Sequence, residues 1–456
     1  MRDLGAIIKA YDIRGVVPEQ LDEALAREVG AAFVRLFPTP GVVVGHDMRP
    51  SSPGLAAAFA EGVAAQGADV VLIGLASTDE LYYASGALDL PGAMFTASHN
   101  PARYNGIKLC RAGASPVGQD SGLTEIRAML EAGVPAPDGA PGRVEQRDVL
   151  HEYADYLRSL VDLRGIRPLR VVVDAGNGMA GHTVPSVFAG LPIDLVAMYF
   201  ELDGNFPHHE ANPIEPANVA DLQAKVRETR ADLGLAFDGD ADRCFVIDER
   251  GEIVAPSTLA ALIAVRELAR EPGAAVIHNL ITSRAVPEII REHGGRPVRS
   301  RVGHSFIKGV MAETGAVFGG EHSGHFYFRD FWRADSGMLA ALHTLAALGT
   351  QDRPLSQLLA EYTRYVPSGE INTEVGDQQA TMDTVQAAFA TRPDVEIDWL
   401  DGLTVSAPDW WFNLRPSNTE PLLRLNAEAA SEATMTKLRD EVLALVRTQT
   451  ATGPTG

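Results

Sequence analysis

A serine follows a predicted strand in the first quarter of the chain. The apolar run Gly92–Phe95 leads directly into the polar segment TASHNP at residues 96–101. A serine at a strand-to-loop turn is well presented as a nucleophile, and Pro101 keeps the chain from continuing in regular structure. Because Ser, Asn and Pro are also common in turns, the segment alone leaves two interpretations of Ser98 open: a nucleophile and an ordinary polar turn.

A run of alternating carboxylates follows another apolar strand. The segment DGDADR at residues 238–243 comes directly after Leu233–Phe237. Asp238, Asp240 and Asp242 can converge on one hard cation, since the intervening Gly and Ala let the loop bend. A solvated acidic turn is the alternative, but such a turn does not usually end a buried strand. Oxygen-only ligands favour magnesium over zinc, so the pattern predicts a magnesium site.

Two further loops carry polar groups suited to a sugar phosphate. The segment GGEHSGH at residues 319–325 follows the apolar run Ala316–Phe318 and offers hydroxyl-binding side chains on a glycine-rich loop. The segment RPSNTEP at residues 415–421 offers a guanidinium, two hydroxyls, an amide and backbone N–H groups, which together suit a phosphate. A plain turn remains open for each of these loops.

A glycine-rich segment, GNGMAG at residues 176–181, spells the dinucleotide-binding pattern after the predicted strand Leu169–Val173. Its context does not fit that pattern, because a turn-rich stretch follows the next strand where a ribose-binding carboxylate is expected. No Walker A sequence is present. We interpret His208 and His209 as loop residues rather than metal ligands.

The composition indicates a globular protein with several domains. Of the 456 residues, 46% are hydrophobic and 22% charged, and the formal net charge of −21 argues against nucleic acid or a membrane surface as a partner. Two cysteines, Cys110 and Cys244, provide no disulfide framework. The N-terminal residues resemble no signal peptide, and no apolar run is long enough to span a bilayer, so we expect a cytoplasmic protein. The sequence leaves a monomer and a dimer open.

Short apolar runs alternate with helical patterns along the chain, which predicts an α/β fold with largely parallel sheets. Helices are expected at Pro53–Gln66 and Thr258–Arg270. The predicted strands are Gly41–Gly45, Asp69–Ile73, Gly92–Thr96, Leu169–Val173, Leu233–Phe237, Cys244–Ile247 and Ala275–Ile277, followed near the C-terminus by Ile371–Val375, Leu403–Ser406 and Leu422–Asn426. A Pro/Gly-rich linker at Gly133–Gly142 and breaks at Asp248–Pro256 and Val366–Gly369 suggest four segments. We expect them to be residues 1–145, 146–252, 253–365 and 366–456.

Four motifs, TASHNP, DGDADR, GGEHSGH and RPSNTEP, occur in this order after YDIRG at residues 11–15. Together they resemble the α-D-phosphohexomutase family over essentially the whole chain. The resemblance implies three related α/β domains and a smaller C-terminal α+β domain of the TATA-box-binding-protein-like type, around a central cleft. It also implies a magnesium-dependent isomerase that moves a phosphate between O1 and O6 of a hexose through phosphoserine and a hexose 1,6-bisphosphate, which also serves as activator.

The resemblance assigns roles to residues. Ser98 would be the phosphoserine, and its oxygen would share the magnesium with Asp238, Asp240 and Asp242. The residues expected at the phosphoryl-transfer centre are His99, Asn100, Lys108 and Arg243, with Tyr11 and Arg14 nearby. Glu321 and Ser323 would hold sugar hydroxyls, and His304 would approach the sugar. Arg415, Ser417, Asn418 and Thr419 would bind the phosphate that does not react. Lys108 and His304 are the candidates for general acid/base catalysis.

The substrate depends on finer details. The Glu-His-Ser-Gly-His form favours a mannose phosphate, with glucose and glucosamine phosphates as alternatives. Some members carry a cleft lysine at the position of Ile281, and Arg284 or Arg301 is a possible replacement. An aspartyl-nucleophile phosphatase and a non-catalytic sugar-phosphate-binding protein are the alternatives outside the family. The first expects a hydroxyl residue where Asp242 stands, and the second has no need of an acidic triad near a serine.

Overall fold

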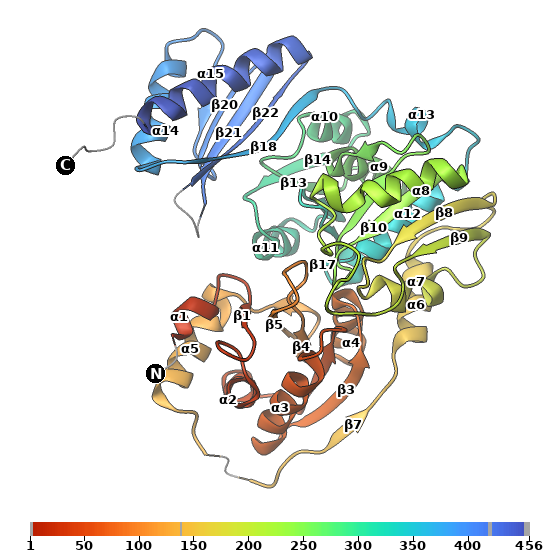
Figure 1. Cartoon of the computed structure of the whole chain (residues 1–456), viewed down its shortest axis with the longest axis vertical. Coiled ribbons are helices and arrows are strands. Elements are labelled where there is room, and N and C mark those ends of the chain that lie inside the picture. Colours follow the sequence, from red (N-terminus) through yellow and green to blue (C-terminus); the bar gives the residue numbers. More distant parts are fainter. Residues whose placement is uncertain (1–2, 137–138, 418–421, 451–456) are drawn as a thin grey trace.

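This computed structural model describes residues 3–136, 139–417 and 422–450. Within them the chain forms four β-sheets, one after another along the sequence (Figure 1). The strands of the four sheets lie within residues 13–146, 169–254, 275–335 and 366–429. The expected fold, three α/β domains and a smaller C-terminal domain, is therefore confirmed.

The first sheet has the strand order β1-β5-β4-β2-β3-β7, with β6 paired to β5. Neighbours from β4 to β7 are parallel, whereas β5 is antiparallel to β4 and to β1. Both faces are covered, because Val42 and Val44 pack on the side of α2 and α3 while Val43 packs with α4 on the other. The elements are α1 (Leu4–Ile7), β1 (Ile13–Val16), α2 (Glu23–Leu36), β2 (Gly41–His46), α3 (Ser52–Ala65), β3 (Asp69–Leu75), α4 (Thr78–Leu88), β4 (Gly92–Phe95), β5 (Tyr104–Arg111), β6 (Ser115–Pro116), η1 (Gln119–Ser121), α5 (Leu123–Ala132) and β7 (Val144–Gln146).

The second and third sheets share one pattern. In each, three parallel strands are followed by two antiparallel ones, in the orders β9-β8-β10-β11-β12 and β14-β13-β15-β16-β17. The elements of the second are α6 (Leu150–Leu160), β8 (Leu169–Asp174), α7 (Ala180–Val187), β9 (Ile193–Met198), η2 (Pro216–Val219), α8 (Ala220–Thr229), β10 (Leu233–Phe237), β11 (Cys244–Ile247) and β12 (Ile253–Val254). Those of the third are α9 (Pro256–Arg270), β13 (Ala275–Asn279), α10 (Ala285–Glu292), β14 (Arg296–Ser300), α11 (His304–Thr314), β15 (Phe318–Gly320), β16 (Phe326–Phe328), η3 (Arg329–Phe331), β17 (Ala334–Asp335), α12 (Gly337–Gly349) and α13 (Leu355–Leu359).

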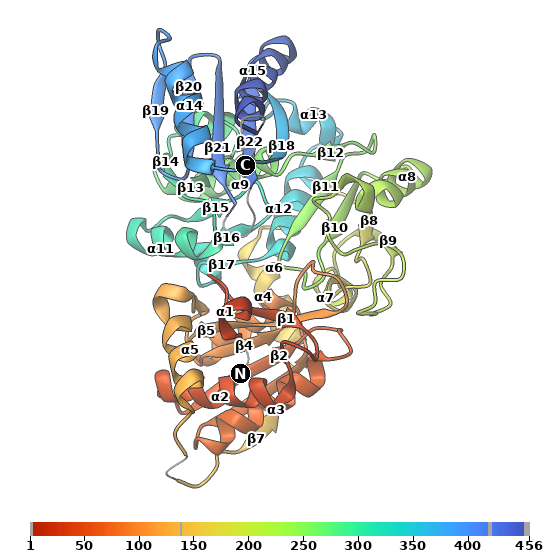
Figure 2. The same ribbon diagram turned by 60° about the vertical axis from the view of Figure 1, so that its left-hand side comes forward.

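The fourth sheet is antiparallel throughout, in the order β18-β22-β21-β20-β19. Two helices cover one of its faces (Figures 1 and 2), where Phe389 and Val442 pack against Phe412 and Leu425. The elements are β18 (Val366–Glu374), α14 (Gln378–Ala390), β19 (Glu396–Asp398), β20 (Leu403–Ala407), β21 (Trp410–Pro416), β22 (Leu422–Ala429) and α15 (Glu432–Thr450). β18 begins earlier than the predicted Ile371, because pairing with β22 already starts at Val366 and continues through a bulge.

The hydrophobic core is continuous through the first three domains. One buried cluster contains Val43 and Leu81 of the first, Leu235 of the second, and Phe318 and Leu342 of the third. The fourth domain has its own core, and a small apolar cluster of Leu280, Ile281 and Trp411 joins it to the third. The first three domains are thus held together by shared apolar burial, whereas the fourth is attached by a smaller contact. Among the helices of the described residues, none combines the length and hydropathy needed to span a bilayer.

Candidate active site

Three of the four sequence motifs occupy the same place in their sheets. The serine loop connects β4 to β5, the acidic loop connects β10 to β11, and residues 321–325 of the GGEHSGH segment connect β15 to β16. Each connection lies where the sheet changes from parallel to antiparallel pairing. The second and third loops also touch directly, since Arg243 forms an isolated β-bridge with His325.

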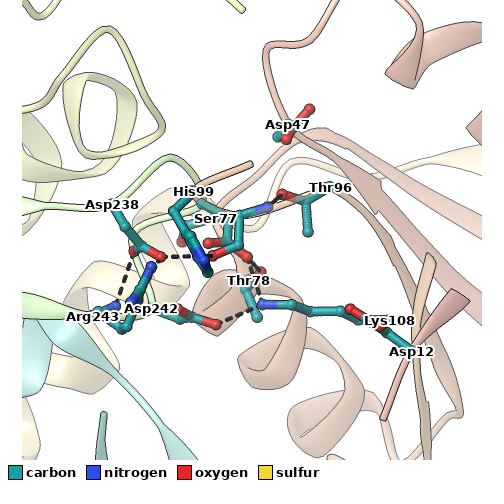
Figure 3. A network of polar contacts seen from close by, with 12 residues as sticks. Asp12, Asp47, Ser77, Thr78, Thr96, His99, Lys108, Asp238, Asp242 and Arg243 are labelled. Carbon is teal, nitrogen blue, oxygen red and sulfur yellow. Dashed lines mark hydrogen bonds and ion pairs between the residues drawn. The ribbon is translucent and has the colours of Figure 1, made fainter. Parts of the chain in front are cut away.

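Ser98 stands at the tip of its loop in a left-handed conformation, with φ of 50°. This conformation is unfavourable for a residue other than glycine and is typical of strained functional turns. The Ser98 backbone N–H donates to Thr96 Oγ1 at 3.0 Å, and Ser98 Oγ donates to Asp238 Oδ2 at 2.7 Å (Figure 3). His99 Nδ1 lies 3.2 Å from the same hydroxyl. The pKa of His99 is held well below its usual range by burial and by the nearby charges of Arg243 and Arg14.

A buried arginine holds the serine loop from beneath. Arg49 Nη2 donates to the carbonyls of Ser98 (2.9 Å) and Asn100 (2.7 Å), and Nη1 donates to those of Pro101 (3.0 Å) and Tyr104 (2.9 Å). Its Nε donates to Asp47 Oδ2 at 3.2 Å. Every N–H of this guanidinium is therefore used, and the loop backbone is fixed by a side chain that sequence reasoning did not identify. Arg49 carries no motif that would have marked it among the other arginines.

The acidic loop meets the serine loop backbone to backbone. A Cβ on Gly239 would lie 2.4 Å from the carbonyl oxygen of Ser98, a separation that only glycine avoids. Asp238, Asp240 and Asp242 are all buried, and their carboxylate oxygens lie within 4.8 Å of one another. The structure thus brings the predicted nucleophile and the predicted metal ligands together from two domains.

The triad is neutralised in part by two cations. Lys108 Nζ lies 2.6 Å from Asp240 Oδ2 and 2.7 Å from Asp242 Oδ2, and Arg243 Nε lies 2.9 Å from Asp238 Oδ2 (Figure 3). Two cations against three carboxylates leave an excess negative charge in a buried place. Oδ1 of Asp240 and Oδ1 of Asp242 are buried and have no hydrogen-bond partner among the described residues. Such oxygens are what a magnesium ion requires, so the residues present fit that ion.

Thr78 helps to determine which carboxylate oxygen of Asp240 is available to bind a cation. Thr78 is the first residue of α4, and its Oγ1 donates to Asp240 Oδ2 at 2.6 Å. Lys108 and Thr78 both bind that oxygen, and Oδ1 is left for a cation. Sequence reasoning missed Thr78, because nothing in the segment ASTDEL at residues 76–81 predicts contact with a loop in another domain.

The electrostatics of the triad follow from burial and charge pairing. Burial alone would raise the pKa of Asp240, but Lys108 outweighs it and holds that pKa below its usual range. Burial and the neighbouring Asp240 raise the pKa of Asp242 to about 7. Burial lowers the pKa of Lys108, but Asp240 and Asp242 reverse this and raise it well above its usual range. These contacts favour the ammonium form of Lys108, which suits charge neutralisation.

The GGEHSGH loop presents a carboxylate that is held rigidly. Glu321 is 2% exposed. Its Oε1 accepts from Asn279 Nδ2 (3.2 Å) and Gly303 N (3.1 Å), and its Oε2 accepts from the Tyr327 hydroxyl (2.7 Å). Ser323 Oγ lies 3.0 Å from His325 Nδ1. The orientation of Glu321 is thus fixed, and few of its lone pairs remain for a sugar.

His325 lies between the second and third loops. Its Nε2 is 3.8 Å from Asp242 Oδ1, and its Nδ1 is 4.0 Å from Glu321 Oε2. The ring therefore stands between the predicted metal ligands and the predicted sugar-binding residues, and it is partly exposed. His325 is part of the GGEHSGH motif, but the sequence alone did not predict which of its two histidines, His322 or His325, lies near the acidic loop.

The N-terminal YDIRG segment joins the same region. Arg14 Nη1 donates to Asn100 Oδ1 at 2.6 Å, and Arg14 also pairs with Asp12. The pKa of Tyr11 is raised by burial and by the charges of Asp401 and Glu321, which places its ring within electrostatic reach of the third and fourth domains. His304 begins α11, and its side chain lies outside the described part of the structure.

Of the predicted phosphate loop, Arg415 and Ser417 are described. Arg415 is the last residue but one of β21 and pairs with Glu370 of β18 at 3.1 Å, and Ser417 is buried. Asn418 and Thr419 lie outside the described residues. Arg284, considered as a replacement for a lysine at Ile281, instead donates to the carbonyls of Ala407 and Pro408 and ties the third domain to the fourth. Ile281 itself is buried against Trp411.

The GNGMAG segment has a structural use. A Cβ on Gly178 would lie 2.7 Å from the carbonyl oxygen of Gly239, so this glycine permits close packing beneath the acidic loop. His209 Nε2 lies 3.1 Å from Asp174 Oδ2, and His208 Nδ1 lies 2.8 Å from Asn177 Oδ1. Neither histidine belongs to a group of potential metal ligands among the described residues.

A serine hydroxyl held against a buried carboxylate triad, with arginine and lysine beside it, has the chemistry of a phosphoryl-transfer enzyme. Comparison with known proteins agrees. Models of the phosphoglucomutase/phosphomannomutase alpha/beta/alpha domains I, II and III match residues 5–134, 151–251 and 255–365, and that of the C-terminal domain matches residues 370–445. The chain belongs to the phosphoglucomutase/phosphomannomutase family and is an intramolecular phosphotransferase.

Individual relatives match this chain over nearly its whole length. A phosphomannomutase of Escherichia coli is 40% identical over 96% of this chain and 98% of its own length. A protein of Xanthomonas campestris pv. campestris named phosphohexose mutases is 41% identical over 95% of this chain and 97% of its own. The crystal structure of a phosphoglucomutase/phosphomannomutase family protein from Burkholderia thailandensis superposes with a TM-score of 0.90, at 34% identity, over 100% of this chain and 99% of that one.

Proposed function

We propose that this protein interconverts mannose 6-phosphate and mannose 1-phosphate, with Ser98 as the phosphoryl carrier. The observation that carries the proposal is the 2.7 Å hydrogen bond from Ser98 Oγ to Asp238 Oδ2, which joins the first domain to the second. It lies beside two buried carboxylate oxygens, Asp240 Oδ1 and Asp242 Oδ1, that have no hydrogen-bond partner among the described residues. A magnesium ion bound by Asp238, Asp240 and Asp242, together with a phosphoserine oxygen, would neutralise charge on the transferred group. Several relatives over nearly the whole chain are named phosphomannomutase.

In the first half-reaction the phosphoserine Oγ–P bond breaks and a new P–O bond forms to the free hydroxyl oxygen at C1 or C6 of the sugar. The proton of that hydroxyl passes to a base, and Ser98 Oγ leaves with the electron pair of the broken bond. The resulting hexose 1,6-bisphosphate turns over in the cleft. In the second half-reaction Ser98 Oγ loses its proton to a base and bonds to the phosphorus of the other phosphate, the P–O bond to the sugar breaks, and the released sugar oxygen takes a proton. Arg243 and Lys108 supply fixed positive charge, and Arg14, His99 and Asn100 line the transfer centre.

We propose His325 as the proton-transferring group in place of Lys108 or His304. Its ring stands between Asp242 and Glu321, whereas Lys108 is committed to two carboxylates. Glu321 and Ser323 would contact sugar hydroxyls, with Tyr11 beside them. Arg415, Ser417, Asn418 and Thr419 would bind the phosphate that does not react. The domain limits 1–145, 146–252, 253–365 and 366–456 and a cytoplasmic location belong to the same proposal.

The test combines mass spectrometry with a substrate comparison. We expect a fraction of the purified protein to carry one phosphoryl group on Ser98, and incubation with a hexose 1,6-bisphosphate to raise that fraction. Initial rates with mannose, glucose and glucosamine 6-phosphates should rank mannose first. A higher kcat/KM for glucose 6-phosphate would assign the protein to the phosphoglucomutases, and an unmodified Ser98 under every condition would contradict the carrier role.

A further inference from the structure

A buried carboxylate lies where the first three domains meet. Asp79, in the first turn of α4, has no solvent exposure. Its Oδ1 accepts from the Ser77 hydroxyl of the same domain at 2.5 Å. Its Oδ2 accepts from the Tyr153 hydroxyl of the second domain at 2.8 Å and from the Ser336 hydroxyl of the third at 2.6 Å. One side chain thus receives a hydrogen bond from each of three domains.

The charge state of this carboxylate makes the connection a strong one. Burial raises the pKa of Asp79 to about 6, although the hydrogen bonds from Ser336, Ser77 and Tyr153 oppose the shift. Near neutral pH the carboxylate is therefore mostly ionised. Hydrogen bonds to an ionised acceptor are shorter and stronger than those between neutral groups, so the donors of all three domains are held firmly at this point.

The starts of α4 and α12, which this carboxylate joins, both contact the acidic loop. Thr78, which precedes Asp79, donates to Asp240 from its backbone N–H and from its hydroxyl. Gly337 is the first residue of α12, directly after the serine that donates to the carboxylate. A Cβ on Gly337 would lie 2.6 Å from the carbonyl carbon of Arg243, so α12 is packed tightly against the end of the loop. The acidic loop is therefore held between the two helix starts.

We propose that Asp79 is a positioning residue for phosphoryl transfer, because its hydrogen bond with Ser336 fixes α4 relative to α12 and so holds the acidic loop in the geometry that binds a cation. The inference rests on the proposed function, which assigns the cation to Asp238, Asp240 and Asp242. Without this bond the two helix starts can separate and the loop gains freedom. The fold itself is retained, since the three domains share one apolar core.

Two alanine variants remove the connection from opposite sides. Asp79→Ala removes the acceptor, and Ser336→Ala removes the donor. For each we expect the affinity for Mn²⁺ to fall by about tenfold and kcat by about 10-fold to 100-fold. KM for mannose 6-phosphate should change little, because the proposed sugar contacts lie on another loop. Asp79→Asn keeps a carbonyl oxygen to which Ser336 can donate, so its Mn²⁺ affinity should lie close to that of the wild type.

Tyr153→Phe is the matched control. It removes a hydrogen bond to the same Oδ2 but leaves α4 joined to α12. Its melting temperature should fall, whereas its Mn²⁺ affinity and kcat should stay near those of the wild type. All proteins are compared as full chains with the same level of phosphorylation on Ser98, and Mn²⁺ affinity is measured by electron paramagnetic resonance titration.

The Mn²⁺ affinities decide the outcome. Wild-type affinity in either alanine variant would overturn the inference. So would an equal loss of affinity in Tyr153→Phe, since the effect would then follow stability alone. If one alanine variant does not fold, the other decides, and if neither folds, Asp79 is only structural and the inference fails. A wild type that binds Mn²⁺ but has no mutase activity would instead overturn the proposed function.

Discussion

Thr78 and Asp240 are joined by two hydrogen bonds across 162 residues of chain. The Thr78 hydroxyl donates to Asp240 Oδ2 at 2.6 Å, and the Thr78 backbone N–H donates to the Asp240 carbonyl at 3.0 Å. The first turn of α4 therefore fixes both the backbone and the side chain of a predicted metal ligand. We therefore expect cation binding by the acidic loop of the second domain to depend on the position of the first domain.

Replacing Thr78 with valine tests this dependence. Thr78→Val keeps the shape but removes the hydroxyl donor, so Asp240 can rotate and offer the wrong geometry to a cation. Since a hydrogen bond to a charged group is worth about 1.5–3 kcal/mol, we expect Mn²⁺ affinity, measured by electron paramagnetic resonance titration, to fall by about tenfold or more. Thr78→Ser retains the donor and should bind Mn²⁺ like the wild type. All three proteins must carry the same level of phosphorylation on Ser98. If Thr78→Val bound Mn²⁺ as tightly as the wild type, the proposed role of Thr78 would be contradicted.

Gly239→Ala probes the approach of the acidic loop to the serine loop. The new Cβ would meet the Ser98 carbonyl oxygen at 2.4 Å, and neither backbone can yield without moving Ser98 away from Asp238. A displacement on the order of 1 Å in an active site lowers turnover about 100-fold, so we expect a loss of that size in kcat with the fold retained in circular dichroism. Gly309→Ala in α11 is the control, because a Cβ there meets nothing within 4 Å. Equal kcat for the two variants would show that the loops can separate without harm.

His325→Ala tests the choice of proton-transferring residue. If the ring transfers the sugar hydroxyl proton, kcat should fall by about 100-fold to 10,000-fold, while KM for mannose 6-phosphate changes little. The same measurements on His304→Ala decide between the two histidines. A larger loss of kcat in His304→Ala than in His325→Ala would return the role to His304.

Glu80 gives the protein a pH-dependent stability. This side chain is 1% exposed, and burial together with the neighbouring Asp79 raises its pKa to about 8. His182 Nε2 lies 3.8 Å from Glu80 Oε2, but burial lowers the pKa of His182, so the pair does not hold charge near neutrality. The folded state keeps a proton on Glu80 that the unfolded state releases above its ordinary pKa near 4.5. This contribution to stability is therefore lost as the pH rises from about 4.5 through about 8.

Glu80→Gln removes this titration and keeps the buried shape. We expect the melting temperature of the variant to exceed that of the wild type by about 2–5 °C at pH 8.5, with the difference vanishing near pH 4.5. Differential scanning fluorimetry across this pH range measures it. The exposed Glu145→Gln on β7 serves as the control. A constant difference at every pH would show that Glu80 does not change its protonation on unfolding.

Local pattern was enough to predict the two strands that flank the acidic loop. Leu233–Phe237 and Cys244–Ile247 form strands with the predicted limits, because each is a short apolar run bounded by turn residues. The spacing of Asp238, Asp240 and Asp242 likewise indicated a cluster, and the structure brings the three together. These features depend on residues close in sequence.

The contacts that position the site are of another kind. Arg49 reaches the carbonyls of residues about 50 positions later, and Thr78 reaches Asp240 in a different domain. Such contacts depend on how whole sheets pack, and neither an arginine nor a threonine has a local signal for them. The place of His325 between two loops likewise required the bridge that joins Arg243 to it.

In three sheets a functional loop follows the strand at which parallel pairing changes to antiparallel pairing. This repeated position has a consequence for the evolution of substrate specificity. The proposed phosphoryl carrier, the proposed cation ligands and the proposed sugar contacts lie on the connections after β4, β10 and β15, each in a different domain. Substitutions in the third domain can therefore retune which hexose is accepted while the carrier and the cation ligands stay as they are. This arrangement allows the hexose specificity to change while the phosphoryl-transfer chemistry is retained.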